Sequence, residues 1–254
     1  MRRHVAERRI FETRPRRVAR GALAAASVVC LLALSARPAA AQAPRDFLAR
    51  LAAEPYAPVV KVVDTESSLG PLATTIQTVT LADLTRFHGH PCDGLVAASA
   101  AIAYGLHALF PDGVVDRTDV IAAVKPSPCF SDAAAYLTGA RTQFGTLALD
   151  PALGDTWILH RRSTGRTVAV SLRDGIKPRE LPDLEARLRS EDCDRALMAR
   201  VRQVQDGYAT AVIARPPAQI FAIEDLPSFP YKDGGIRPDA TKAACKAGAP
   251  AVSR

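Results

Sequence analysis

The spacing of hydrophobic residues along the chain changes between the period of a helix and that of a strand. Residues 94–109 are hydrophobic around most of the helical circumference, which predicts a buried helix that ends at the following Pro-Asp-Gly. Residues 119–124, Asp-Val-Ile-Ala-Ala-Val, are typical of a strand that is covered on both faces. Residues 155–174 hold two β-rich runs around a polar Arg-Ser-Thr-Gly-Arg turn and predict a hairpin.

The other predicted elements are shorter. After the buried strand, a loop with two prolines leads into a helix that stops at Gly139. The remaining patterns predict, in chain order, a helix over 42–56, a strand within 57–66, helices around 181–188 and 197–208, and an extended piece over 216–230. We therefore expect one α+β domain over residues 45–230, with a mixed β-sheet flanked by helices. Residues 231–254 are rich in Gly, Ala and Pro, and we expect a poorly ordered tail.

The net charge of +7 lies in the first 41 residues. That segment holds nine of the chain's 33 basic residues and two of its 26 acidic ones, which leaves 24 of each in the remainder. The remainder is therefore neutral, and we expect no nucleic-acid partner.

The arginines precede a hydrophobic run over residues 21–36 and small residues that suit cleavage after Ala41. This order is typical of a signal peptide over residues 1–41, so we expect a periplasmic protein. The run is shorter than the ~20 residues that a spanning helix needs, so no stable membrane anchor is expected. Arg16 and Arg17 hint at twin-arginine export, but the hydrophobic residues that usually follow are absent, and the general secretory route is favoured.

Two histidines and a cysteine occupy alternate positions in Arg-Phe-His-Gly-His-Pro-Cys-Asp-Gly, residues 86–94. Pro91 disfavours a helical conformation of His90, so we expect an extended segment that turns His88, His90 and Cys92 to one side. Asp93 is the expected N-cap of the buried helix. Cys92 would then lie at a helix N-terminus, where the thiolate is favoured.

Cys129 has a similar setting, because it also follows a proline and precedes a helix, with Ser131 or Asp132 as the expected cap. The two cysteines could face one another across a cleft. Imidazole and thiolate donors suit zinc first, and also copper, iron or nickel. The predicted ligand set is His88, His90, Cys92 and Cys129.

Simpler interpretations stay open at this point. A lone His-x-His is often a surface feature, and Cys92 could form a disulfide with Cys129 in an exported protein. Cys193 is expected to be a buried thiol, with a Cys193–Cys245 disulfide as the alternative.

The remaining candidates are outside the predicted ligand set. His107 is expected to be a core residue and His160 to lie on a hairpin strand, whereas Lys125 and Tyr136 could reach the cleft as proton donors.

Three segments resemble the FmdE family, which takes its name from formylmethanofuran dehydrogenase. They are residues 87–95 (Phe-His-Gly-His-Pro-Cys-Asp-Gly-Leu), residues 128–139 (Pro-Cys-Phe-Ser-Asp-Ala-Ala-Ala-Tyr-Leu-Thr-Gly) and residues 219–226 (Gln-Ile-Phe-Ala-Ile-Glu-Asp-Leu). The resemblance covers about residues 80–228 and implies a thioredoxin-like α+β core with a metal-binding active site at the His/Cys motif. It assigns His88, His90 and Cys92 to the first motif, and Cys129 and Asp132 to the second.

The sequence departs from the family pattern in three ways. Asp93 stands where the family usually has proline, and Ala140 stands where a further cysteine is common. The C-terminal cysteine-rich zinc finger of many relatives is absent, because Cys245 is the only cysteine in the tail.

Three functions remain open. The first is an exported FmdE-like protein that binds Zn²⁺ or another divalent transition metal and acts on an unidentified small molecule, with Cys92, Cys129 and Asp132 as catalytic residues. The second is a non-enzymatic metal-binding or delivery protein, and the third a thiol–disulfide protein that uses Cys92 and Cys129. A homodimer is also left open.

Overall fold

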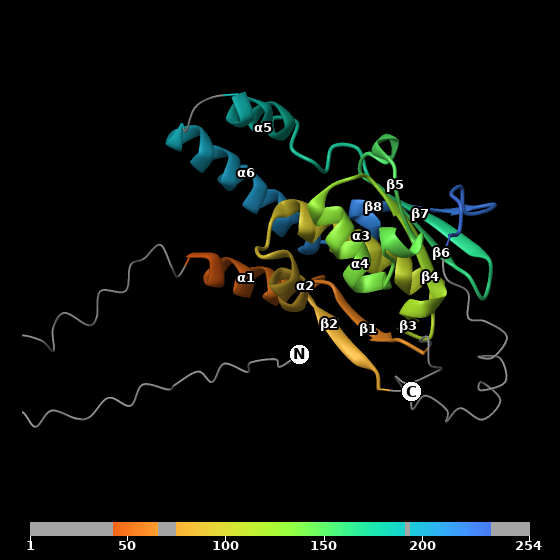
Figure 1. Cartoon of the computed structure of the whole chain (residues 1–254). Helices are drawn as coiled ribbons and strands as arrows, with labels where there is room; N and C mark the ends of the chain where they lie inside the picture. Colours follow the sequence, from red (N-terminus) through yellow and green to blue (C-terminus); the bar gives the residue numbers. More distant parts are fainter. Residues whose placement is uncertain (1–42, 66–74, 191–193, 235–254) are drawn as a thin grey trace, which may run out of the picture. The chain divides into compact units, whose positions relative to one another are not determined.

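The computed structural model describes residues 43–65, 75–190 and 194–234, which belong to one compact unit (Figure 1). The predicted signal peptide, Cys193 and Cys245 lie outside these residues. Helices and strands are mixed along the unit, which confirms the α+β class. A thioredoxin-like arrangement stays a prediction.

The elements follow one another in this order: α1 (Ala43–Ala53), β1 (Val59–Val63), β2 (Gln77–Thr80), α2 (Leu81–His88), α3 (Asp93–Leu109), β3 (Val114–Asp116), β4 (Val120–Val124), α4 (Pro128–Thr138), β5 (Leu147–Leu149), β6 (Thr156–Arg161), β7 (Arg166–Leu172), α5 (Leu181–Ser190), α6 (Arg195–Ile213), α7 (Pro217–Ile220) and β8 (Phe221–Leu226). The buried helix, the buried strand and the hairpin are confirmed as α3, β4 and β6–β7. The piece expected to be extended over 216–230 begins with the one-turn helix α7 and continues as β8.

The described strands form two mixed sheets, where the sequence led us to expect one. A five-stranded sheet has the order β5-β4-β6-β7-β8, with β4 parallel to β5 and the other pairs antiparallel. A three-stranded sheet has the order β2-β1-β3, with β1 antiparallel to β2 and parallel to β3.

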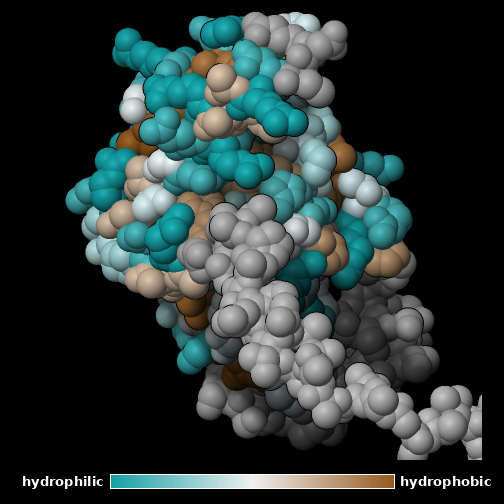
Figure 2. Space-filling model, turned by 90° about the vertical axis from the view of Figure 1, so that its left-hand side faces the viewer, coloured by the Kyte–Doolittle hydropathy of each residue, from teal (hydrophilic) through white to brown (hydrophobic). Residues whose placement is uncertain are grey.

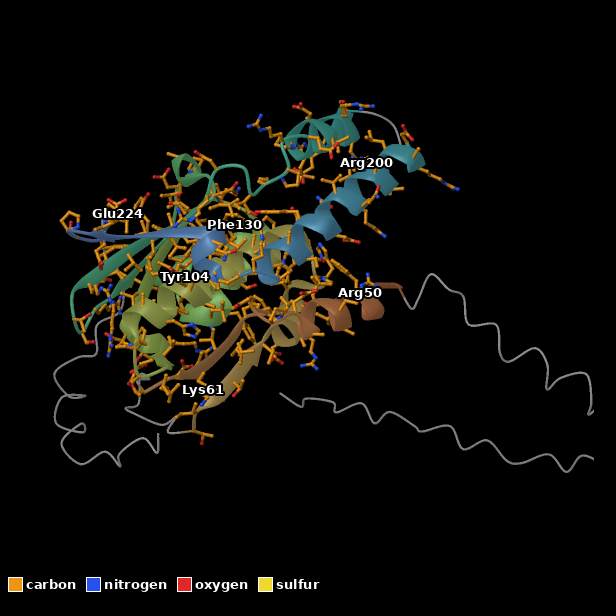
Figure 3. All side chains as sticks on the ribbon, turned by 180° about the vertical axis from the view of Figure 1, so that it is seen from behind. Arg50, Lys61, Tyr104, Phe130, Arg200 and Glu224 are labelled. Carbon is orange, nitrogen blue, oxygen red and sulfur yellow. The ribbon has the colours of Figure 1, made fainter. Side chains whose placement is uncertain are left out.

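The core lies where α3 and α4 pack on the five-stranded sheet, as Figure 1 shows. Every residue of β4 is buried, as its continuous hydrophobic run predicted. Gly105 lets α3 approach closely, because a β-carbon there would lie 2.7 Å from Leu159 Cδ1 on β6. Trp157 of β6 is fully buried and stacks on Phe130 of α4, with ring centroids 4.7 Å apart. Phe130 lies inside the fold in Figure 3.

The start of the predicted tail makes contacts with the sheet region. The Tyr231 hydroxyl donates to Asp150 (2.7 Å), and Arg162 pairs with Asp233 (2.7 Å). Residues 231–234 are therefore fixed against the loops around β5 and β6.

The helices α5 and α6 pack against each other, and α6 also packs on α3. Arg200 of α6, which Figure 3 labels, binds Glu180 just before α5 at 2.9 Å. Figure 2 shows that the described surface on one side is mostly hydrophilic, with scattered hydrophobic residues. None of the described helices combines the length and hydrophobicity that crossing a membrane requires.

Candidate metal centre

His88 is the last residue of α2, so the expectation of an extended chain from His88 to Cys92 is wrong. Thr80 and Asp83 form a capping box that starts α2, and the helix runs on to Gly89. Gly89 has φ 103°, a left-handed conformation that glycine adopts without strain and that turns the chain. The restriction from Pro91 acts on His90 alone, which does lie outside the helix.

Cys92 is itself the N-cap of α3, in place of the expected Asp93. Its Sγ accepts a hydrogen bond from the Leu95 backbone N–H at 3.4 Å. Asp93 occupies the first turn instead, where a carboxylate also interacts favourably with the helix dipole.

Cys129 lies in the first turn of α4, next to Pro128. The N-cap is Ser127, so neither Ser131 nor Asp132 caps the helix as expected. Gly94 allows the first turns of the two helices to meet, because a β-carbon at Gly94 would lie 3.1 Å from the Cys129 Sγ. Gly94 was not singled out from the sequence, although a glycine directly after a Cys-Asp pair was a visible signal.

The structure brings His88, Cys92 and Cys129 together. The two Sγ atoms are 3.2 Å apart, and the His88 Nε2 lies 3.6 Å from the Cys92 Sγ and 3.7 Å from the Cys129 Sγ. Their donor atoms all lie within 4.8 Å of one another, close enough to hold one metal ion.

These distances can be compared with those in a zinc site. Tetrahedral zinc with bonds of about 2.3 Å to sulfur and about 2.0 Å to nitrogen places its ligands about 3.8 Å (S–S) and about 3.5 Å (S–N) apart. The nitrogen–sulfur distances fit directly, and the sulfurs would have to separate by about half an ångström. A disulfide would require the sulfurs to approach to about 2.05 Å.

Asp132 orients the histidine. Its Oδ2 lies 2.8 Å from the His88 Nδ1, and the His88 side chain is only 5% exposed. When Nδ1–H donates its hydrogen bond to the carboxylate, the lone pair of Nε2 points to the two sulfurs. Asp132 thus contacts the predicted ligand set through His88.

His90 is exposed and lies outside the three-residue group. Its ring packs against the His88 ring, with centroids 4.8 Å apart. The left-handed turn at Gly89 separates the two histidines, so the predicted convergence of His88 and His90 on one point is not seen.

The two thiols differ in acidity. The hydrogen bond with Cys92 lowers the pKa of Cys129 to about 6, and the nearby His88 imidazole and Ser127 act in the same direction. The same hydrogen bond and burial raise the pKa of Cys92. The pair therefore loses its first proton readily, and Cys129 carries the negative charge.

The other candidates are not part of this three-residue group. His107 is exposed on α3, so the expectation of a core histidine is wrong. His160 lies on β6, as expected, and contacts the Thr167 hydroxyl at 2.9 Å. Tyr136 packs on Phe87, with ring centroids 5.2 Å apart, and Lys125 binds Asp155.

The comparisons with known proteins agree with the motifs. The family described as "FmdE, Molybdenum formylmethanofuran dehydrogenase operon" matches residues 87–222. A solved structure of a tungsten formylmethanofuran dehydrogenase FmdE-like protein from Syntrophus aciditrophicus is 19% identical, with a TM-score of 0.37 over 60% of this chain and 74% of that one. No curated protein matches. Because the family match spans more than half of the chain, the chain belongs to the FmdE family.

Proposed function

We propose that this chain is an exported FmdE-family protein that binds zinc or a similar divalent transition metal at His88, Cys92 and Cys129. The observation that carries the proposal is the convergence of one imidazole nitrogen and two sulfurs from three separate helix ends. Nitrogen and sulfur donors favour zinc. The sequence of the first 41 residues supports export to the periplasm.

Three protein ligands leave a fourth position for water or a small molecule, which is the usual arrangement of catalytic zinc sites. A metal ion bound there would supply a Lewis acid that polarises a carbonyl or acidifies a bound water. Asp132, 35% exposed, holds His88 in the tautomer that leaves Nε2 free to bind the ion. These features support chemistry on a small molecule rather than a closed structural site.

Metal content tests the proposal. We expect the mature protein, purified from the periplasm without a histidine tag, to contain close to one equivalent of metal by elemental analysis. His88→Ala, Cys92→Ala and Cys129→Ala should each remove it, because two ligands hold an ion far more weakly than three. His107→Ala is the matched control, since His107 is exposed and lies outside the group.

Metal-free wild-type protein that takes up no zinc under reducing conditions would contradict the proposal. Loss of metal from His107→Ala would show that the ion sits elsewhere.

The 3.2 Å separation of the two sulfurs supports a second candidate, a thiol–disulfide protein. In that reaction the two thiols give up two protons and two electrons to an oxidised disulfide partner, which becomes a dithiol as the Cys92–Cys129 bond forms. Such a protein would cycle between its oxidised and reduced forms in a glutathione redox buffer. His88→Ala would keep this cycle but lose metal, so the same variant separates the two functions.

A further inference from the structure

A group of charged side chains lies at the end of the five-stranded sheet where the chain leaves β4 for α4. Lys125 follows β4, Asp155 precedes β6, and Lys177 lies in the loop after β7. Since β4 and β6 are antiparallel, as are β6 and β7, these three positions share one end of the sheet. The loop from Lys125 leads directly to Cys129.

Two lysines bind one carboxylate there. The Lys125 Nζ lies 2.7 Å from Asp155 Oδ1, and the Lys177 Nζ lies 3.3 Å from Asp155 Oδ2. All three side chains are roughly one-third exposed. Although burial acts in the opposite direction, the two lysines lower the pKa of Asp155, so it stays ionised and the trio carries a charge of +1. Each ammonium has three N–H donors, and among the described residues each uses one of them.

Lys125 also covers an aromatic stack. Its Nζ lies 4.3 Å from the centre of the Phe130 ring, which stacks on Trp157. Phe130 is the residue after Cys129, so the Lys125 ammonium lies at the first turn of α4, the turn that also holds Cys129. The cation–π contact restricts where the ammonium can move.

Tyr208 of α6 adds a hydroxyl. The residue is only 5% exposed, yet the described residues offer its hydroxyl no hydrogen-bond partner. The hydroxyl is also missing from the fully buried unpartnered atoms among these residues, so it reaches solvent. Burial and the charges of Asp155 and Asp93 raise its pKa, which keeps it a proton donor.

Asp93 links this group to the metal centre. Its charge acts on both thiols, on Tyr208 and on Lys177. The charges of Glu185 and Lys177 act on the Asp93 carboxyl in opposite directions, so Lys177 has an acidic neighbour in Asp93. Lys125 is therefore the ammonium that is better placed to attract an anion.

We propose that Lys125, Lys177 and Tyr208 bind the carboxylate of a small molecule next to the His88–Cys92–Cys129 centre. A salt bridge that only stabilised the fold would need one lysine, whereas two leave a net positive charge and unused donors. Asp155 binds one ammonium at each of its oxygens, and the Tyr208 hydroxyl supplies a third donor from the α6 side. This proposal depends on the proposed function in one respect only, the metal ion at the neighbouring centre.

Succinate is the probe, and neutral succinamide of the same length is the matched control compound. The first readout is the fluorescence of Trp157, the only tryptophan of the chain, because its ring stacks on Phe130. The second readout is saturation-transfer NMR of the probe. At constant ionic strength we expect saturable binding of succinate and none of succinamide. The titration uses both metal-free and zinc-loaded protein.

We expect Lys125→Met to weaken succinate binding about tenfold or more, Lys177→Met by a smaller factor, and Tyr208→Phe about threefold to tenfold. Lys61→Met, at an exposed position of β1 in the other sheet, should change nothing (Figure 3). Circular dichroism tests whether each variant is folded. If Lys125→Met does not fold, Lys125→Gln replaces it.

Equal binding of succinate and succinamide, no binding in either readout, or unchanged affinity in the Lys125 variant would overturn the proposal. Since the metal-free titration does not require zinc, failure of this subsite and failure of the metal site give different results.

Discussion

At the scale of single residues, the contact between Asp132 and His88 explains how one imidazole nitrogen is kept free for a ligand. In Asp132→Asn the neutral amide oxygen accepts a weaker hydrogen bond from the His88 Nδ1–H than the carboxylate does, so His88 is held less firmly. We expect zinc affinity to fall about 10- to 100-fold. Competition with a coloured chelator measures it.

Asp174→Asn is the matched control, since Asp174 is exposed in the loop after β7. If both variants bind zinc like the wild type, Asp132 does not orient the ligand.

The unequal thiols make a second residue-scale prediction. Because the pKa of Cys129 is lowered to about 6, its alkylation by iodoacetamide in metal-free protein should rise with pH through about 6. An ordinary thiol reacts this way only near pH 8.5. Cys92, whose pKa is raised, should react only at higher pH than Cys129. Mass spectrometry of the labelled peptides follows each site.

Cys129→Ser should remove the early phase. A single phase with a midpoint above pH 8 would contradict the assignment.

At the scale of elements, α3 makes much of the contact between the helices and the five-stranded sheet, against β6 and β7. In Gly105→Ala the new β-carbon would lie 2.7 Å from Leu159 Cδ1 and 2.9 Å from Val170 Cγ2. The crowding costs about 1–3 kcal/mol, which outweighs the ~1 kcal/mol that alanine gains in a helix. We therefore expect the free energy of unfolding in urea to fall by roughly 1 kcal/mol.

Gly207 of α6 offers the matched control, because a β-carbon at that position would have no heavy atom within 4 Å apart from the neighbouring helix backbone. Gly207→Ala should raise the free energy of unfolding by about 0.5–1 kcal/mol. Equal effects of the two alanines would show that α3 is not packed tightly on β6 and β7.

At the scale of the whole molecule, Asp155 joins β6 to the loops after β4 and β7 and makes stability depend on pH. Its pKa is lower in the folded protein, because Lys125 and Lys177 outweigh burial. The stabilisation is therefore present above the ordinary carboxyl pKa of about 4 and is lost as the pH falls through the lower, folded value. Asp155→Asn should cost on the order of 1 kcal/mol at pH 7 and little at pH 2.5.

Urea unfolding of metal-free protein at the two pH values measures this difference. If Asp155→Asn lowers the free energy of unfolding equally at both pH values, the loss comes from packing and not from the charge of Asp155.

The sequence by itself determined the elements whose patterns are local. The hydrophobic run of α3, the continuous hydrophobic strand β4 and the β6–β7 hairpin follow from periodicity and turn chemistry, which neighbours in sequence decide. The motifs around Cys92 and Cys129 were also sufficient to predict the FmdE family.

The geometry of the centre was decided by tertiary structure. The sequence predicted alternation from His88 to Cys92, but the capping box at Thr80 extends α2 to His88, and the left-handed Gly89 then turns His90 away. The contact of Cys92 with Cys129 depends on how closely α3 and α4 approach, which Gly94 permits.

Of the cluster of Lys125, Asp155, Lys177 and Tyr208, the sequence indicated only that Lys125 could reach the cleft. Its members lie on four separate segments, and only the pairing of β4, β6 and β7 brings Lys125, Asp155 and Lys177 to one place. Local patterns fix which residues form helices and strands, whereas distances between remote side chains depend on how those elements pack.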